Sequence, residues 1–210
     1  LTSGAGIQYN SYAHAFGGMT IQFMLFNGID VGIGMLLLRQ RGLWRRFRAA
    51  PLSKLVLLSS RAVSATLIGM LILAVVFTYA RLVFGVKIEG SLTGMIGVCA
   101  SFALMTATYG LLIAALGKTP EAARGLSILA TLMLVMLSGA WVPSFLFPQW
   151  LQAATKFLPT RWAMDGLDGM TWRGLPLSDA MLPIAVLLGS SLMVAPVVQA
   201  ESQFGLLSKQ

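Results

Sequence analysis

The amino-acid sequence predicts an all-α fold, a polytopic bundle of membrane-spanning helices, and two observations lead to this prediction. Hydrophobic residues make up 57% of the 210 positions and charged residues only 10%, whereas an average soluble domain carries about 25% charged residues. The apolar residues also lie in five long runs, each close to the ~20 residues with which a helix crosses a bilayer. These runs are continuous, whereas the strands of a membrane β-barrel alternate apolar and polar residues. The composition therefore excludes a soluble globular enzyme and predicts a single transmembrane domain in a lipid bilayer.

The apolar runs divide the chain into spans and connecting segments. The chain begins at Leu1 rather than at Met, so we expect a fragment or a processed chain that lacks one earlier span. We expect residues 1–13 to form an outer segment, 39–54 a cytoplasmic loop and 143–177 an outer hairpin. The five predicted spans are 15–38, 55–83 (with its start at either 55 or 62), 92–116, 126–142 and 180–199.

The basic residues predict the orientation of these spans. Loops rich in Lys and Arg stay on the cytoplasmic side of a membrane, and seven of the 15 bases lie close together between the first two spans. An odd number of spans then places the N-terminus of the chain outside and its C-terminus in the cytoplasm, with the protein in the inner or plasma membrane. The net charge of +8 is thus explained by topology, and we expect no nucleic-acid partner. The seven bases are Arg39, Arg41, Arg45, Arg46, Arg48, Lys54 and Arg61.

The loop at 39–54 has the pattern of a short amphipathic helix. Its apolar residues Leu43, Trp44, Phe47 and Ala50 recur at intervals of one, three and three, which places most of them on one helical face. Gly42 precedes this helix, and Pro51 ends it because proline removes a backbone donor. One interpretation is an interfacial helix whose arginines bind anionic headgroups at about 1 kcal/mol each. The other is a docking element for a cytoplasmic partner, and both can hold at once.

The segment that follows the fourth span is rich in tryptophan and proline. Aromatic rings gather at the headgroup level of a membrane, and proline interrupts helices where backbone groups can find other partners. We interpret the segment as a short hairpin that dips into the outer leaflet, and the alternative is a plain interfacial loop with an aromatic belt. The residues concerned are Trp141, Trp150, Trp162, Trp172, Pro143, Pro148 and Pro159.

Asp30 is the only acidic residue within a predicted span. An ionised carboxylate there is costly in lipid, so we expect a buried side chain that faces a partner or a water-filled cavity. Gly28 and Gly32 flank it and form a pair of small residues that lets helices approach closely. A role in the substrate path and a role in helix packing therefore both remain open.

The sequence shows no pattern typical of a catalytic or metal site. It has one cysteine, Cys99, which we expect to be a small apolar filler, and one histidine, His14, which we expect at the membrane interface. A phosphate-binding loop ending at Gly117, Lys118 and Thr119 would need a glycine at position 112, which is Leu112. We therefore expect no cofactor, no metal and no enzymatic activity in this chain.

Several of these segments, taken in order, resemble a known family. The chain reads RQRGL at Arg39 to Leu43, then APLS at Ala50 to Ser53, and later LSGAWVP, FPQWLQ and LPTRWAMDGL. This succession resembles the membrane subunit of ABC-type exporters of the type-two permease class, with the last five of its six spans. Two positions depart from the family pattern, since Gln40 stands where Glu is common and Leu43 where Thr is frequent.

The resemblance implies a permease subunit that pairs with a second copy or a homologue and with cytoplasmic ABC ATPase subunits, which bind the ATP. Its substrate would be hydrophobic or amphipathic, such as a drug, a lipid or a glycan-like molecule. The coupling residues would be Arg39, Gln40, Gly42, Leu43, Trp44, Phe47, Arg48 and Pro51. Residues of the outer hairpin near the exit would be Trp141, Pro143, Pro148, Trp150 and Pro159, and those of the path or of helix packing Gly28, Asp30 and Gly32.

Two other classes of membrane protein are alternatives to this one. A secondary transporter or channel driven by an ion gradient normally has ionisable residues or broken helices in several spans, and here only Asp30 is available. An enzyme that acts on lipids within the membrane would need a polar catalytic set near an interface, and the sequence shows none.

Overall fold

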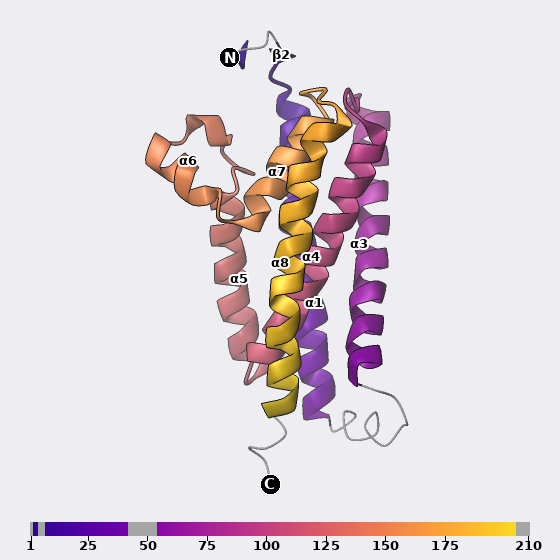
Figure 1. Ribbon diagram of the computed structural model, residues 1–210, viewed down its shortest axis with the longest axis vertical. Coiled ribbons are helices and arrows are strands. Elements are labelled where there is room, and N and C mark those ends of the chain that lie inside the picture. Colours follow the sequence, from indigo (N-terminus) through magenta and orange to yellow (C-terminus); the bar gives the residue numbers. More distant parts are fainter. Residues whose placement is uncertain (1, 4–6, 42–53, 205–210) are drawn as a thin grey trace.

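The computed structural model describes residues 2–3, 7–41 and 54–204, and it is a bundle of long helices (Figure 1). Two short strands, β1 (Thr2–Ser3) and β2 (Ile7–Gln8), pair antiparallel ahead of the first helix. The long helices are α1 (Ser11–Gln40), α3 (Lys54–Phe84), α4 (Leu92–Leu116), α5 (Pro120–Leu137) and α8 (Leu177–Phe204). Between α5 and α8 lie a 3-10 turn (Ser144–Leu146) and the shorter helices α6 (Gln149–Thr155) and α7 (Pro159–Met170).

Five helices in the described part of the chain are long and apolar enough to cross a membrane. Their most apolar windows have mean hydropathies between 1.4 and 2.3. The predicted all-helical membrane fold with five spans is thereby confirmed, and the chain starts and finishes at opposite ends of the bundle (Figure 1). We call these the N-terminal end, drawn at the top of Figure 1, and the C-terminal end.

The fourth long helix differs in its bounds from the predicted span at 126–142. It begins six residues earlier, at Pro120, because the Thr119 hydroxyl accepts a hydrogen bond from the backbone N–H of Ala122 and proline suits the first helical position. It ends at Leu137, and Gly139 follows with a φ of 87°. Apolarity alone missed this start because the first turns carry Glu121 and Arg124.

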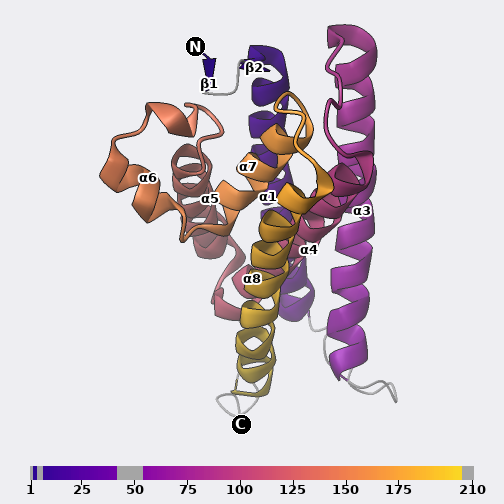
Figure 2. The same ribbon diagram turned by 45° about the horizontal axis from the view of Figure 1, so that its top comes forward.

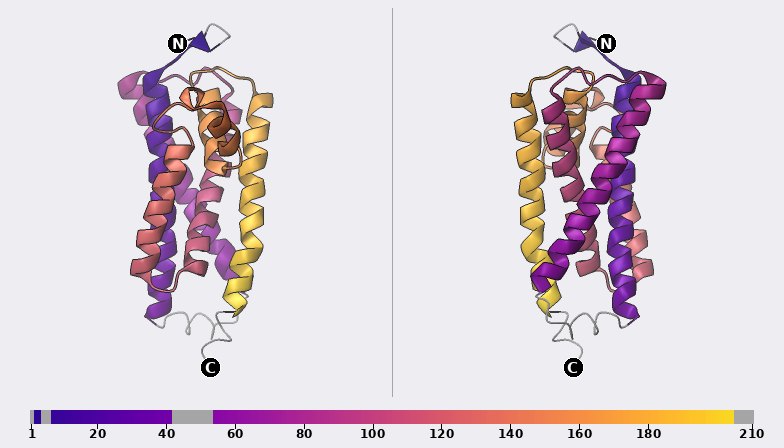
Figure 3. Two further views of the ribbon diagram at one scale, coloured as in Figure 1. Left: turned by 90° about the vertical axis from the view of Figure 1, so that its left-hand side faces the viewer. Right: turned by 90° about the vertical axis from the view of Figure 1, so that its right-hand side faces the viewer.

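Helix α4 lies at the centre of the bundle, where it packs against α1, α3 and α8 (Figures 2 and 3). Most of the largest side chains that are fully buried come from these helices and from α7, and they include Phe102, Ile21, Leu25, Leu73, Leu187 and Leu167. The backbones of α1 and α4 approach each other closely. A Cβ on Gly32 would lie 2.4 Å from the carbonyl oxygen of Gly110, and one on Gly110 would lie 2.4 Å from that of Gly28. Glycine is thus required where α1 meets α4, since any side chain would separate the two helices.

Helices α6 and α7 form a helical hairpin at the N-terminal half of the bundle. Helix α7 packs against α8, α4 and α1, whereas α6 stands off to one side (Figures 1 and 2). Pro159 is the first residue of α7, where its missing N–H is not needed. The depth of this hairpin in a bilayer stays a prediction.

Candidate functional site

An exposed ion pair joins α1 to α5 on the face of the bundle opposite α3. Arg124 donates from Nη2 to Oδ1 of Asp30 at 2.9 Å. The side chains of Asp30 and Arg124 are 65% and 51% exposed. The expectation that Asp30 is buried is therefore wrong for the single chain, although a partner, one of its two expected surroundings, is present.

Asp30 lies on the side of α1 opposite to the two glycines that flank it. Helical residues advance by about 100° each, so Gly28 and Gly32 share a face and Asp30 points away from it. The glycines contact α4, since a Cβ on Gly28 would lie 2.7 Å from the carbonyl oxygen of Thr106. The geometry thus gives these residues different roles. Gly28 and Gly32 pack against α4, whereas Asp30 lies on the opposite face of α1 and contacts α5.

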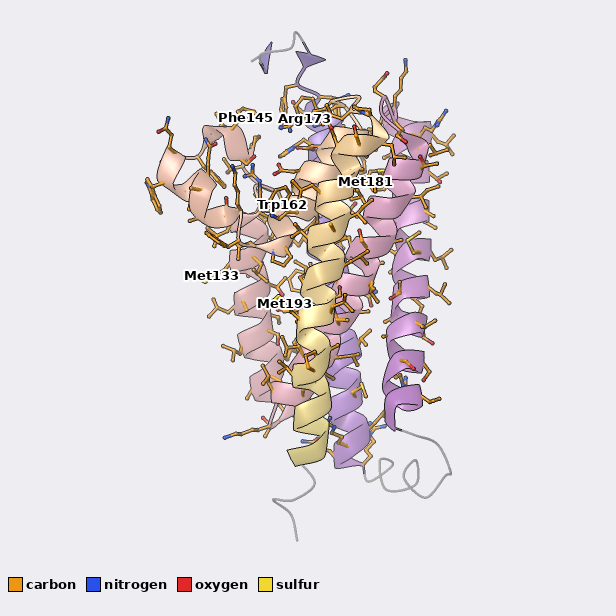
Figure 4. The ribbon with its side chains drawn as sticks, in the orientation of Figure 1. Met133, Phe145, Trp162, Arg173, Met181 and Met193 are labelled. Atoms are coloured by element: carbon orange, nitrogen blue, oxygen red, sulfur yellow. The ribbon has the colours of Figure 1, made fainter. Side chains whose placement is uncertain are left out.

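A second polar contact lies along the same pair of elements, closer to the N-terminal end. Trp141, just after α5, donates from Nε1 to Oε1 of Gln22 on α1 at 3.0 Å, and this contact is also exposed. On the same side of α1 as Asp30, Met19 and Phe23 are exposed. Leu129 and Met133 of α5 are exposed as well, but they lie about 140° and 180° around that helix from Arg124; Met133 is labelled in Figure 4. We call this face the α1–α5 seam, defined by Gln22, Asp30, Arg124 and Trp141.

At the C-terminal end, the last turn of α1 is tied to the last turn of α4. Arg39 donates from Nη1 to the carbonyl oxygen of Ala114 at 3.0 Å. Gln40 is the last residue of α1. The other predicted coupling residues, Gly42, Leu43, Trp44, Phe47, Arg48 and Pro51, lie outside the described residues.

The predicted residues of the outer hairpin are spread over its turns. Pro143 and Pro148 immediately precede the 3-10 turn and α6, and Trp150 on α6 is 71% exposed. Within the hairpin, Trp162 donates from Nε1 to the carbonyl oxygen of Lys156 at 2.7 Å and so joins α7 to the end of α6; Trp162 is labelled in Figure 4. The structure therefore brings Trp141 to the α1–α5 seam, whereas Trp150 is exposed on α6.

A buried polar pair that sequence reasoning missed lies at the N-terminal end. His14 on α1 and Asp168 on α7 contact through Nδ1 and Oδ2 at 2.8 Å, and both are almost fully buried. The expectation of an interfacial His14 is therefore wrong, because α7 covers it. The sequence offered one sign of this pair, which is the position of Asp168. It lies three residues after Asp165, on one face of α7, and most other residues of this helix are buried. Asp165 instead accepts a hydrogen bond from Nε of Arg161 at 2.7 Å.

Aromatic rings surround this pair. The Tyr9 ring lies 5.5 Å from the His14 ring and 5.3 Å from the Trp172 ring, between ring centroids. Burial raises the pKa of Tyr9, and the nearby charge of Asp168 raises it further. The phenol of Tyr9 therefore stays protonated at neutral pH, and His14, Asp168 and Tyr9 form one compact polar cluster.

The described residues contain no group of three or more His, Cys, Asp or Glu side chains that could hold a metal ion. Cys99 is buried in the main hydrophobic core, beside residues such as Val98 and Phe102. Gly117, Lys118 and Thr119 form the short connection between α4 and α5, in which Gly117 ends one helix and Thr119 caps the next.

Comparison with known proteins identifies the family. Residues 2–171 match the family described as ABC-2 type transporter. The chain is 26% identical over 183 residues to the linearmycin resistance permease protein LnrN of Bacillus subtilis strain 168, which covers 87% of this chain and 47% of LnrN. It is also 26% identical over 185 residues to YvfS of the same organism, whose name assigns it provisionally to the transport permeases, and this covers 84% of this chain and 75% of YvfS.

The chain thus spans about half the length of LnrN and three quarters of YvfS. No solved structure matches it. The family match covers most of the 210 residues, including helices α1 to α7. This extent, together with the five membrane-type helices, shows that the chain belongs to the ABC-2 type transporter family.

Proposed function

We propose that the chain is the membrane-spanning subunit of an ATP-driven exporter, and that two such subunits enclose the substrate path along the α1–α5 seam. Family membership supports the coarser statement, a transport permease of an ABC transporter. ATP would be bound and hydrolysed by separate cytoplasmic subunits. The name of LnrN refers to resistance to linearmycin, and resistance favours export of a hydrophobic or amphipathic compound over import.

The observation that carries this proposal is the exposed pair of Asp30 and Arg124. Asp30 lies ten residues before the end of α1, which at 1.5 Å per residue is about 15 Å along the helix. A charged side chain at the centre of a lipid-facing helix costs about 2.5–3.5 kcal/mol on insertion scales. A face that carries such a pair is therefore better placed against a second subunit or a water-filled path than against lipid.

The coupling of ATP hydrolysis to this path would run through the loop at 39–54. This loop joins α1 to α3, and the bond from Arg39 to Ala114 links the same end of α1 to α4. A push on the loop would thus act on α1 and α4 together. The hairpin of α6 and α7 lies at the opposite end of the bundle and is proposed to border the exit.

Association with the ATPase subunits is tested by co-purification. Exchange of Leu43 and Phe47 to aspartate is expected to abolish association with the ATPase while membrane insertion is kept. The matched control, Leu43→Met with Phe47→Leu, keeps the apolar contact and is expected to keep the ATPase. Recovery of the aspartate variant with its ATPase, in normal yield, would contradict docking through this loop.

The path is tested by transport and by substrate-stimulated ATP hydrolysis. Asp30→Asn and Arg124→Gln are each expected to lower both activities, and the charge exchange Asp30→Arg with Arg124→Asp to restore part of them. Glu121→Gln, an exposed change one turn away on α5, serves as the control. Unchanged activity in both single variants would remove the pair from the path. Transport that continues without ATP but requires an ion gradient would instead favour a secondary transporter.

A further inference from the structure

A polar pocket lies at the N-terminal end of the bundle, away from the α1–α5 seam. Its volume is about 570 Å³, and it is formed where the loop between α3 and α4 meets the turn after α7 and the start of α1. Figure 4 labels Arg173 at this end of the molecule. We call it the loop pocket, and its lining residues are Asn10, Gly85, Lys87, Glu89, Trp172, Arg173 and Gly174.

The backbone around the loop pocket is fixed by hydrogen bonds between its two loops. The N–H groups of Glu89 and Gly90 donate to the carbonyl oxygens of Thr171 and Met170 at 3.0 and 3.1 Å. Two lining glycines have left-handed backbones, Gly85 with a φ of 64° and Gly174 with a φ of 63°. Such conformations are strained for other residues, so the shape of the pocket is specified by the sequence.

Two residues that line the loop pocket carry buried hydrogen-bond donors that find no acceptor in the described part of the chain. Trp172 is only 6% exposed, and its buried Nε1 has no hydrogen-bond partner there. The same holds for the buried Nε of Arg173, whose guanidinium carbon lies 5.1 Å from the centre of the Trp172 ring. Buried donors are nearly always satisfied in folded proteins, so these two groups indicate a ligand rich in acceptor oxygens.

The charges around the loop pocket favour an anion. Lys87 and Arg173 supply two positive charges and Glu89 one negative charge. No ion pair within 4.0 Å joins these three side chains to each other or to other described residues. The two cations are therefore available to a ligand, and the pocket has a net positive charge.

The aromatic residues beside the loop pocket favour a position at the headgroup level of a membrane. Helix α3 ends at Phe84, one residue before the pocket begins, and Phe84 lies within 4.9 to 6.0 Å of the rings of Phe16, Tyr12 and Tyr79. Aromatic clusters of this kind mark the boundary between hydrocarbon and water. An anionic group in the pocket would thus lie in the layer of lipid phosphates.

We propose that the loop pocket binds the phosphate of an anionic phospholipid headgroup, held by Lys87, Arg173 and the indole N–H of Trp172. The site is separate from the proposed substrate path, and the proposal holds whether or not the chain exports its substrate. A bound lipid would join the loop after α3 to the turn after α7 at the membrane surface. Glu89 would weaken the binding of an anionic headgroup by charge repulsion.

Titration of the detergent-solubilised protein, in complex with its subunits, with dihexanoyl phosphatidylglycerol tests the proposal. Each cationic side chain near an anionic lipid surface contributes about a fivefold gain in affinity. Lys87→Gln with Arg173→Gln is therefore expected to weaken binding roughly 30-fold. The control Lys156→Gln removes an exposed charge from the end of α6, outside the pocket, and is expected to leave the affinity unchanged.

A variant of opposite sign separates binding from misfolding. Glu89→Gln removes the repulsive charge and is expected to tighten binding about fivefold, which damage to the fold would not do. Dihexanoylglycerol, which lacks the phosphate, is expected not to bind. Equal affinity of the wild type and the double variant, or weaker binding by Glu89→Gln, would overturn the proposal. Binding of inorganic phosphate that is as tight as that of the lipid would overturn the assignment to a lipid headgroup.

Discussion

Replacement of Gly32 by alanine is expected to push α1 away from α4 and to destabilise the bundle. The new Cβ would lie 2.4 Å from the carbonyl oxygen of Gly110 and 3.1 Å from the Cβ of Ile113, whereas ordinary contacts begin at 3.4 Å. The oxygen belongs to a helical backbone and cannot rotate away, so the helices must separate locally by about 1 Å. A gap of this size forfeits a quarter to a half of the dispersion energy of each contact that it opens.

The control for this change lies two residues along the same helix. A Cβ on Gly34 would meet nothing within 4 Å. Both changes gain up to about 1 kcal/mol of helix propensity, so the difference between the variants isolates the steric effect. Overpacking of this kind typically costs about 1–3 kcal/mol, which corresponds to a difference of roughly 2–12 °C in Tm for a protein of this size.

The measurement is thermal unfolding of the two variants and the wild type in the same detergent or nanodisc. We expect Gly32→Ala to unfold at a lower temperature than Gly34→Ala. Gly110→Ala should act on the same contact between α1 and α4, because its Cβ would lie 2.4 Å from the carbonyl oxygen of Gly28. The double variant Gly32→Ala with Gly110→Ala should then lose less than the sum of the single losses, since one separation relieves both contacts. Equal Tm values for Gly32→Ala and Gly34→Ala would refute the close approach of the two helices.

Three further predictions concern the N-terminal end and one helix cap. His14→Ala leaves the buried carboxylate of Asp168 without its partner, so the free energy of unfolding is expected to fall by about 3–5 kcal/mol. The double variant His14→Phe with Asp168→Leu should recover much of this loss, and chemical unfolding of both variants measures it. The pKa of Tyr9 is raised in the folded state from 10.0, so its stabilising effect is present below pH 10 and is lost as the pH rises above it; Tyr9→Phe should show a smaller alkaline loss of stability than the wild type. Thr119→Ala should cost about 1 kcal/mol because it removes the cap of α5, while Thr119→Ser should be nearly neutral in the same unfolding assay.

The spans could be predicted from the sequence because a membrane helix is specified locally, by about 20 consecutive apolar residues. The start of α5 could not be found in this way. Its first turns are polar, and the helix begins there because Thr119 caps it and Pro120 fits its first position. The capping residues, considered together with hydropathy, would have located the start of α5.

The polar pairs were harder to predict, because each joins elements that are far apart in the chain. His14 and Asp168 are separated by 154 positions and Asp30 and Arg124 by 94, and no periodicity within a helix shows which distant residue it meets. The sequence identified Asp30 as unusual and predicted either a partner or a water-filled cavity for it. It could not show that the partner lies on α5, or that the small residues beside Asp30 face another helix.

Helix α1 contacts α4, α5 and α7 and runs through the whole length of the bundle. Its last turn is bonded to α4 through Arg39, its middle contacts α4 through Gly28 and Gly32 and α5 through Asp30, and its first turn is bonded to α7 through His14. With 30 residues α1 is about 45 Å long, and no proline interrupts it. A displacement at the loop after Gln40 would therefore reach α7, and with it the outer hairpin, through one continuous helix. In the proposed exporter, the double variant His14→Phe with Asp168→Leu, which lacks this bond but should recover much of the stability, is expected to keep the ATPase and its ATP hydrolysis but to lose transport. Unchanged transport in this variant would limit the bond to a structural role.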